Sequence, residues 1–363
     1  MYLQSPSLFT CTPHRSTVPF TCTPHRSPVP FTCTFYFSLF IVSRNIIIFS
    51  LLSLLLAVLF VFDILTGAAD VPLSALWTEG TAHNILIGLR LPKALTAVLA
   101  GVALSISGLL MQTLFRNPLA GPSVLGVSGG ATLGVALLVF MGTALGFTAS
   151  AWSSVIFAIL GATVVLLLAM AVAAKVNDNV TLLIVGMMIG AIAGALVNVL
   201  QNFADPDSLK LFITWTLGSL SSVGWQEMQV LLPVIFVGVI VSIALLKALN
   251  GLQLGEDYAA ALGVPVRLVR TLIILATGLL AGAITAFCGP ISFVGVAIPH
   301  LARGLFRTSN HHITLPASAL LGADLLLMCD IVCYSSTYPL PISTISALFG
   351  APVVMYVVMK QRH

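Results

Sequence analysis

The first candidates for functional side chains in this sequence are the carboxylates that lie inside long apolar stretches. Asp324 and Asp330 both lie in the apolar stretch 313–333. Buried acids of this kind serve as proton relays or ion sites in many carriers driven by ion gradients. The remaining apolar stretches are poor in ionisable groups, which argues against such a relay. We therefore expect structural roles, with Asp330 near an outer interface and Asp324 paired with a neighbouring helix.

Histidine and cysteine could supply a metal site, but their spacing does not favour one. His300 follows Pro299, and His311 and His312 are adjacent in a short polar stretch. Zinc would need a further nearby ligand, and neither HExxH nor CxxC occurs in this region. We expect hydrogen-bonded or solvated histidines, no metal and no cofactor bound by this chain. Small hydrophobic roles are expected for Cys288, Cys329 and Cys333.

Motifs for nucleotide hydrolysis and acyl transfer are missing from the sequence. There is no GxxxxGK[ST] phosphate loop, no GxSxG elbow and no credible catalytic pair. The glycine-rich stretch 108–134 surrounds the turn Arg116-Asn117-Pro118, and small residues there are typical of close helix contacts in membranes. The chain is therefore not expected to hydrolyse nucleotide or to be an enzyme.

One short polar segment, GEDYAAALGV at 255–264, stands between long apolar stretches. Gly255 can precede a helix, Glu256 and Asp257 suit the positive end of its dipole, and Gly263 ends it. A helix of this length cannot cross a bilayer, which requires about 20 apolar residues. We expect it to lie along a membrane surface against a soluble partner.

Composition determines the class of protein. Charged residues make up 7% and hydrophobic residues 58% of the 363 residues, whereas soluble domains carry about 25% charged residues. The apolar blocks have helical rather than ten-residue alternating lengths, which favours spanning helices over a barrel. The net charge of +4 is spread over loops, so it indicates membrane orientation and not nucleic-acid binding.

The N-terminus carries a repeat that does not resemble the rest. Cys11, Cys22 and Cys33 recur in FTCTPHRSTVP, FTCTPHRSPVP and FTCTFYF. A metal-binding tail is one interpretation, and a low-complexity extension or a start codon placed too early is the preferred one. We assign residues 1–44 to a disordered or misassigned extension and residues 45–363 to a transmembrane domain.

Hydropathy predicts an all-α integral membrane protein with ten spanning segments. They lie near 46–65, 91–115, 123–143, 152–174, 180–203, 228–249, 268–288, 291–308, 313–333 and 340–359. Gly289, Pro290 and Pro299 interrupt the eighth, and a broken helix at membrane depth must be surrounded by protein or a cavity. Residues 204–227 contain LFITWTLGSL, which is too short to cross and is expected at the outer surface.

Basic residues predict the orientation. With the N-terminus inside, the outer face holds only Arg90, Lys93 and Lys210. The inner face collects the other basic residues of the spanning domain: Arg44, Arg116, Lys175, Lys247, Arg267, Arg270, Arg303, Arg307, Lys360 and Arg362. This distribution satisfies the positive-inside rule, so both termini and the 255–264 helix are expected in the cytoplasm.

Four stretches together resemble one known family. They are RLPKALTAVLAGVALSISGLLMQTLFRNPLAGPSVLGVSGGA (90–131), LGEDYAAALGV (254–264), GPISFVGVAIPHLAR (289–303) and LPASALLGA (315–323). They closely resemble the membrane subunits of bacterial ABC importers for iron-siderophores, haem and cobalamin, the FecCD-type permeases. The likeness runs from about residue 46 to the C-terminus.

The resemblance implies a type II importer permease with ten helices in the bacterial cytoplasmic membrane. Its implied partners are a second permease copy or sister subunit, two cytoplasmic ATPases that bind ATP and Mg, a periplasmic or lipoprotein substrate-binding protein, and the metal chelate. The implied ATPase-coupling helix comprises Gly255, Glu256, Asp257, Tyr258, Ala260, Leu262 and Gly263. On this interpretation, Glu256→Arg or Leu262→Asp weakens ATPase binding and abolishes transport.

Two further sites are implied by the resemblance. Arg90 and Lys93 match the family's basic residues that dock the binding protein, although both could instead be snorkelling interfacial side chains. Asp178 and Asn179 match the turn where family members narrow the pathway on the cytoplasmic side. The sequence departs from the family at Tyr334 and at Pro339, where relatives carry an arginine and a glutamate, so one docking contact is expected to differ.

Several functional alternatives remain open at this stage. An iron-siderophore is the first-ranked cargo, followed by haem and cobalamin. A secondary transporter driven by an ion gradient predicts functional intramembrane carboxylates and no docking helix, and an intramembrane enzyme would need a catalytic pair. A homologue without transport activity is a further reading.

Overall fold

The structure is a computed structural model that describes residues 31–67, 80–142, 150–176, 178–335 and 340–361. Pro339 and residues 1–30 of the predicted extension lie outside these ranges. The chain divides into two units, Met1–Ile48 and Phe49–His363, and the second carries the spanning helices described below. Helix α1 (Phe31–Leu65) begins inside the predicted extension and continues past its boundary at residue 44.

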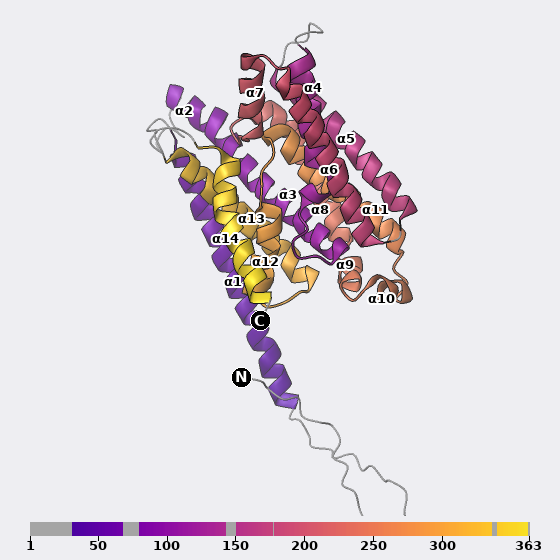
Figure 1. Cartoon of the computed structure of the whole chain (residues 1–363). Helices are drawn as coiled ribbons and strands as arrows, with labels where there is room; N and C mark the ends of the chain where they lie inside the picture. The colour runs from indigo at the N-terminus through magenta and orange to yellow at the C-terminus, as the bar shows by residue number, and fades with distance from the viewer. Residues whose placement is uncertain (1–30, 68–79, 143–149, 177, 336–339, 362–363) are drawn as a thin grey trace, which may run out of the picture. The chain divides into compact units, whose positions relative to one another are not determined.

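Within the described residues the secondary structure is helical throughout (Figure 1). After α1 the elements are α2 (Thr81–Ile85), the π-helical turn η2 (Leu86–Arg90), α3 (Leu91–Phe115), the 3-10 turn η3 (Pro122–Leu125), α4 (Val127–Gly142), α5 (Ala151–Lys175), α6 (Asn179–Asn202), α7 (Pro206–Thr216), α8 (Trp225–Ala244), α9 (Leu246–Gln253), α10 (Glu256–Ala261), α11 (Val266–Cys288), α12 (Val294–Phe306), α13 (His311–Tyr334) and α14 (Ile342–Gln361).

The ten predicted spans correspond to ten apolar helices among the described residues. Seven are long and apolar enough to cross a membrane, and α4, α12 and part of α14 are shorter apolar helices. The predicted span 228–249 is the main departure in bounds, because α8 ends at Ala244 and α9 follows. Leu249 and Leu252 of α9 are buried against protein. Hydropathy alone cannot distinguish such buried apolar residues from residues that contact lipid.

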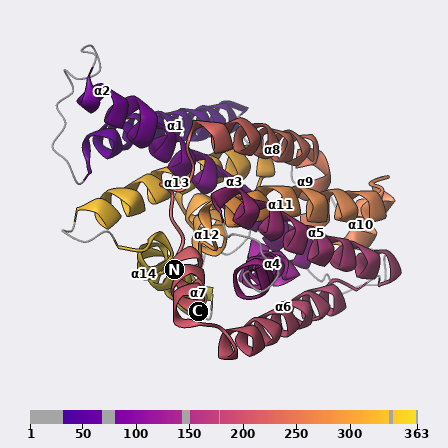
Figure 2. The same cartoon turned by 90° about the horizontal axis from the view of Figure 1, so that it is seen from above.

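Helices α3 and α11 form the centre of the helical unit, as the view in Figure 2 shows. The most apolar windows of the α2–α3 segment and of α11 are 78% and 72% buried, against 28% for α5 and 22% for α6. Small residues explain this position of α3, because they allow helix backbones to approach closely. A Cβ built on Gly108 would lie 1.8 Å from the carbonyl oxygen of Gly295, so only glycine fits at this contact between α3 and α12.

The interrupted eighth span is interior, as the sequence predicts. Gly289 and Phe293 have positive φ angles, 77° and 66°, and the regular helix α12 begins only at Val294. Pro299 and His300 of α12 are buried. The short amphipathic helix α7 lies in the region where we expected a segment too short to cross.

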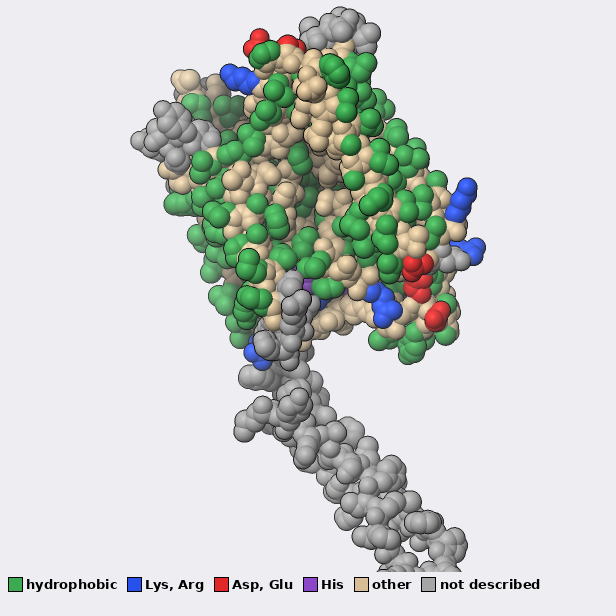
Figure 3. Space-filling view, viewed as in Figure 1, with side chains coloured by type: hydrophobic (Ala, Val, Ile, Leu, Met, Phe, Trp, Pro, Cys, Tyr) green, Lys and Arg blue, Asp and Glu red, His purple; other side chains and the backbone are tan. Residues whose placement is uncertain are grey.

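The two ends of the helical unit differ from its wall. Helix α7 lies at one end and α10 at the other (Figure 1), and we call these the α7 end and the α10 end. On the face seen in Figure 3, hydrophobic side chains cover the wall, whereas charged side chains lie around the two ends. This distribution fits a multi-pass membrane protein.

Candidate functional site

Helix α10 is short, polar and sharply bounded on both sides. Gly255 precedes it with φ 123°, a conformation that side-chain-bearing residues rarely adopt. After the helix, the Gly263 amide donates to the carbonyl of Ala260, and the Val264 amide donates to that of Ala259. This is a Schellman termination, with Gly263 at φ 82°. The two glycines therefore have the capping roles that the sequence indicates.

Most of the predicted coupling residues form an exposed face. Tyr258 is 52% and Leu262 61% exposed, and Asp257, Ala260 and Gly263 are also exposed. Leu254, just before α10, adds a further exposed apolar side chain. The face thus carries large apolar side chains at an end that is otherwise polar, which is typical of a surface that binds another protein.

Glu256 is different, because it points toward the body of the chain. Its carboxylate accepts hydrogen bonds from Arg270 Nη2 at 3.0 and 3.1 Å and from Asn179 Nδ2 at 2.6 Å. The Glu256 side chain is 29% exposed and that of Arg270 5% exposed. Replacing Glu256 therefore perturbs an internal contact, and our expectation that Glu256→Arg reports on partner binding needs correction on this ground.

The predicted gate residues adjoin this contact. Asn179 Nδ2 also donates to the carbonyl of Leu114 at 2.9 Å, and Arg270 Nη1 donates to the carbonyl of Val176 at 2.8 Å. The structure thus brings α10, α11, the end of α3 and the start of α6 together. We call Glu256, Arg270 and Asn179 the α10 cluster.

Asp178 has a local role at the start of α6. Its carboxylate accepts hydrogen bonds from the hydroxyl and the backbone amide of Thr181, at 2.7 and 2.9 Å. These donors favour the charged form and hold the pKa of Asp178 below its ordinary value. Asp178 is therefore the N-cap of α6, and whether it also narrows a pathway stays a prediction.

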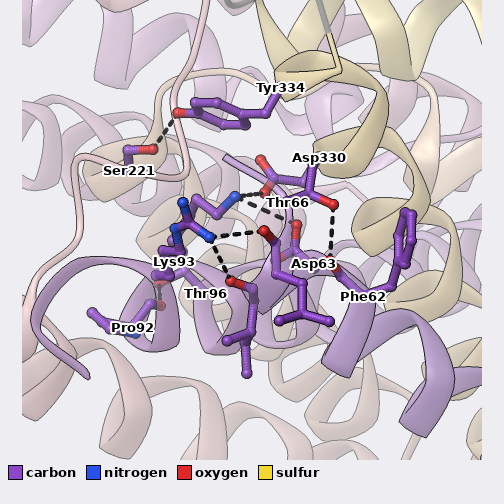
Figure 4. A network of polar contacts seen from close by, with 12 residues as sticks. Phe62, Asp63, Thr66, Pro92, Lys93, Thr96, Ser221, Asp330 and Tyr334 are labelled. Atoms are coloured by element: carbon purple, nitrogen blue, oxygen red, sulfur yellow. Dashed lines mark hydrogen bonds and ion pairs between the residues drawn. The ribbon is translucent and has the colours of Figure 1, made fainter. Parts of the chain in front are cut away.

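Arg90 and Lys93, the predicted docking residues, are buried rather than exposed at a rim. Arg90 Nη1 donates to the carbonyls of Ile64 and Leu65 at the end of α1, at 3.0 and 2.8 Å. Lys93 Nζ forms ion pairs with Asp330 at 2.6 Å and Asp63 at 3.4 Å (Figure 4). Both cations are engaged within the chain, so docking of a binding protein by them stays a prediction that the geometry does not favour.

We call Asp63, Lys93 and Asp330 the α7-end cluster. Their side chains are at most 6% exposed. The Lys93 ammonium lies 4.2 Å from the centroid of the Tyr334 ring, whose hydroxyl hydrogen-bonds to Ser221. The cluster joins α1, α3 and α13. Tyr334, where the resemblance implies an arginine, connects it to Ser221 in the turn after α7.

Asp330 thus has the structural pairing that the sequence favours, but Asp324 does not. Both carboxylate oxygens of Asp324 are buried and lack a hydrogen-bond partner among the described residues, so the expected pairing is not observed. We have no physical account of this carboxylate.

The ring nitrogens of the two buried histidines have hydrogen-bond partners, as expected. His300 Nε2 lies 2.6 Å from the carbonyl of Pro118, and His311 Nε2 lies 2.9 Å from the Thr113 hydroxyl.

Two partners in these clusters were missed at the sequence level. No partner was predicted for Asp63, and Arg270 was predicted only as a basic residue of the inner face. A signal for Arg270 exists, because it falls on the same helical face as Ile273, Ile274 and Thr277, which are buried. A basic residue on a buried face needs a buried partner.

In the described residues no group of three or more acidic, histidine or cysteine side chains could hold a metal.

Comparisons with known proteins agree on one family. The model of the FecCD transport family matches residues 55–360. The hemin transport system permease protein HmuU of Yersinia pestis is 34% identical over 86% of this chain and 95% of its own length. The vitamin B12 import system permease protein BtuC of Klebsiella pneumoniae is 34% identical over 86% and 93%. A solved structure of a metal-chelate type ABC transporter in an inward-facing conformation shares 33% identity, with TM-score 0.77, over 85% of this chain and 97% of that chain.

Proposed function

Because the chain belongs to the FecCD transport family, we propose that it is the permease subunit of an importer that carries a metal chelate inward, driven by separate ATPase subunits. An iron-siderophore complex ranks first as cargo, and haem or cobalamin are the alternatives, since relatives are named for hemin and vitamin B12. The chain is a transporter subunit and not an enzyme, and in this family ATP hydrolysis takes place on separate ATPase subunits.

The exposed face of α10 is the observation that carries the proposal. Tyr258 and Leu262 offer apolar surface at the end where basic residues gather, which is the cytoplasmic end by the positive-inside rule. A separate ATPase that closes on ATP can displace a short helix of this kind and so favour one access state of the pathway over the other. We place the ATPase at the α10 end and the substrate-binding protein at the α7 end, in a bacterial cytoplasmic membrane with both termini inside.

A carrier driven by an ion gradient is the second reading that the sequence left open. It requires intramembrane carboxylates that can exchange a cation or proton with the pathway. Asp63 and Asp330 are buried and paired with Lys93, and this geometry favours a fixed structural role for these two carboxylates. Family membership supports the ATP-driven reading instead.

Reconstitution of the permease with its ATPase and binding protein tests the proposal. We expect uptake of labelled ferric siderophore into vesicles that contain ATP and none into vesicles that contain a non-hydrolysable analogue. Labelled haem and cobalamin in parallel distinguish the cargoes. Uptake of any chelate without ATP would contradict the ATP-driven mechanism.

A docking variant tests the α10 face separately. Leu262→Asp is expected to reduce ATPase co-purification strongly while the permease stays folded, because it puts a charge in an apolar contact surface. Leu211→Asp on α7 is the matched control, since Leu211 is 46% exposed at the opposite end. Equal ATPase recovery with both variants would place the ATPase elsewhere.

A further inference from the structure

The neighbouring short helices α9 and α10 pack on each other, but their polar side chains hydrogen-bond to different parts of the chain. On α9, Asn250 Oδ1 accepts from the backbone amide of His311 at 2.9 Å, and Gln253 Nε2 donates to the carbonyl of Ser309 at 2.7 Å. These contacts fix α9 to the start of α13. Helix α10, by contrast, is attached through Glu256 to α11 and to the start of α6. Gly255, between the two helices, permits a change of direction.

Glu256 accepts three hydrogen bonds from two donor groups. One carboxylate oxygen, Oε1, lies 2.6 Å from Asn179 Nδ2 and 3.0 Å from Arg270 Nη2, and Oε2 lies 3.1 Å from the same Arg270 nitrogen. An ionised carboxylate only accepts hydrogen bonds, so it suits this position, whereas an amide would turn its NH2 group toward one of the donors. Charge-assisted hydrogen bonds of this kind are stronger and more directional than neutral ones.

The other ends of these contacts hold the turn between α5 and α6. Arg270 Nη1 binds the carbonyl of Val176, just after α5, and Asn179 is the first residue of α6. Short polar contacts therefore link α10 to the residues on both sides of this turn. The Glu256 side chain is 29% exposed, so the contact lies at the rim of the chain, beside solvent.

We propose that Glu256, Arg270 and Asn179 form a strut that moves the start of α6 together with α10, while α9 stays with α13. This rests on the proposed function, because it supplies the route from an ATPase at the α10 face to the pathway. Glu256 is thus a positioning residue that faces away from the ATPase.

The test uses the complete reconstituted transporter. Glu256→Gln is nearly isosteric and keeps the exposed α10 face. We expect normal ATPase co-purification but about a tenfold decrease in cargo taken up per ATP hydrolysed. The matched control is Glu227→Gln, because Glu227 accepts from one backbone amide, that of Gly224, at 2.9 Å, which an amide oxygen can also accept. The control is expected to transport like the wild type.

Distances between spin labels supply a second readout. Labels at Ala261 on α10 and Val180 on α6 are both on exposed residues, and Lys247 on α9 is an exposed reference. In the wild type we expect the Ala261 to Val180 distance to stay constant on ATP trapping, while the Lys247 to Val180 distance changes. In Glu256→Gln the Ala261 to Val180 distance is expected to change as well.

The outcomes separate the two proposals. Wild-type complexes that hydrolyse ATP without uptake would refute the proposed function and the strut with it. Normal wild-type uptake, together with a Glu256→Gln variant that matches Glu227→Gln in uptake per ATP, would refute the strut alone. A wild-type Ala261 to Val180 distance that changes on ATP trapping would do the same.

Discussion

The α7-end cluster and the α10 cluster both pair a basic side chain with carboxylate, but their surroundings differ. Asp63, Lys93 and Asp330 are almost completely buried and join helices long enough to cross a membrane. In the α10 cluster, Glu256 is 29% exposed and belongs to a helix of 6 residues. A buried ion cluster is costly to break because its charges cannot reach water, whereas a contact at the rim costs less to break. The first arrangement suits a fixed scaffold, and the second suits a moving part.

The largest effect is expected when the sealed cluster loses its cation. Lys93→Met leaves two carboxylates buried without their partner, and breaking a buried ion pair in this way costs about 3–5 kcal/mol. We expect poor expression and a strongly lowered melting temperature in detergent. Adding Asp63→Asn and Asp330→Asn to the same chain is expected to restore much of the stability, because no unpaired charge remains. A stable Lys93→Met single variant would show that the cluster does not hold the scaffold.

The same kind of change in the α10 cluster is expected to cost less. Arg270→Met leaves Glu256 without its ion pair, but that carboxylate can turn toward water, so the loss of stability is about 1–2 kcal/mol. Uptake per ATP is expected to fall as for Glu256→Gln. Comparing the melting temperatures of Lys93→Met and Arg270→Met tests the difference between the clusters, and equal values would contradict it.

Salt is expected to act on one cluster only. Raising the ionic strength to about 1 M shortens the screening length to about 3 Å and weakens solvent-accessible charge pairs. The coupling defect of Arg270→Met relative to wild type should therefore shrink in high salt, since the wild type loses part of its own contact. The stability difference between Lys93→Met and wild type should not change. Both quantities are measured on the same preparations.

The smallest effect concerns the cap beside the α10 cluster. The pKa of Asp178 is lowered by its bonds to Thr181, so the folded state binds fewer protons there than the unfolded chain. The cap therefore stabilises α6 above the ordinary carboxyl pKa, and this contribution is lost as the pH falls through the lowered value. We expect Asp178→Ala to melt slightly below wild type at neutral pH and to converge with it in acid. Asp178→Asn keeps an acceptor that does not titrate, so its difference from wild type at neutral pH should be smaller.

Local and periodic features of this protein could be predicted from sequence. The apolar helices follow from the cost of unpaired backbone groups in a membrane, which long apolar runs satisfy only as helices. The bounds of α10 follow from Gly255 and Gly263, whose conformations depend on a few neighbouring residues. The interior position of the broken α12 follows from its glycine and proline content.

The partners of charged residues were decided by the tertiary structure alone. Lys93 and Asp63 are 30 positions apart, and Lys93 and Asp330 are farther apart still. No local sequence pattern therefore indicates that these side chains are in contact. Arg90 and Lys93 were predicted to be exposed because the positive-inside rule uses only the number of basic residues on each side of the membrane. The rule contains no information about which residues lie next to them. Likewise, Glu256 and Asp257 have the same character in sequence. The helical direction of each side chain turns Glu256 toward Arg270 and leaves Asp257 in solvent.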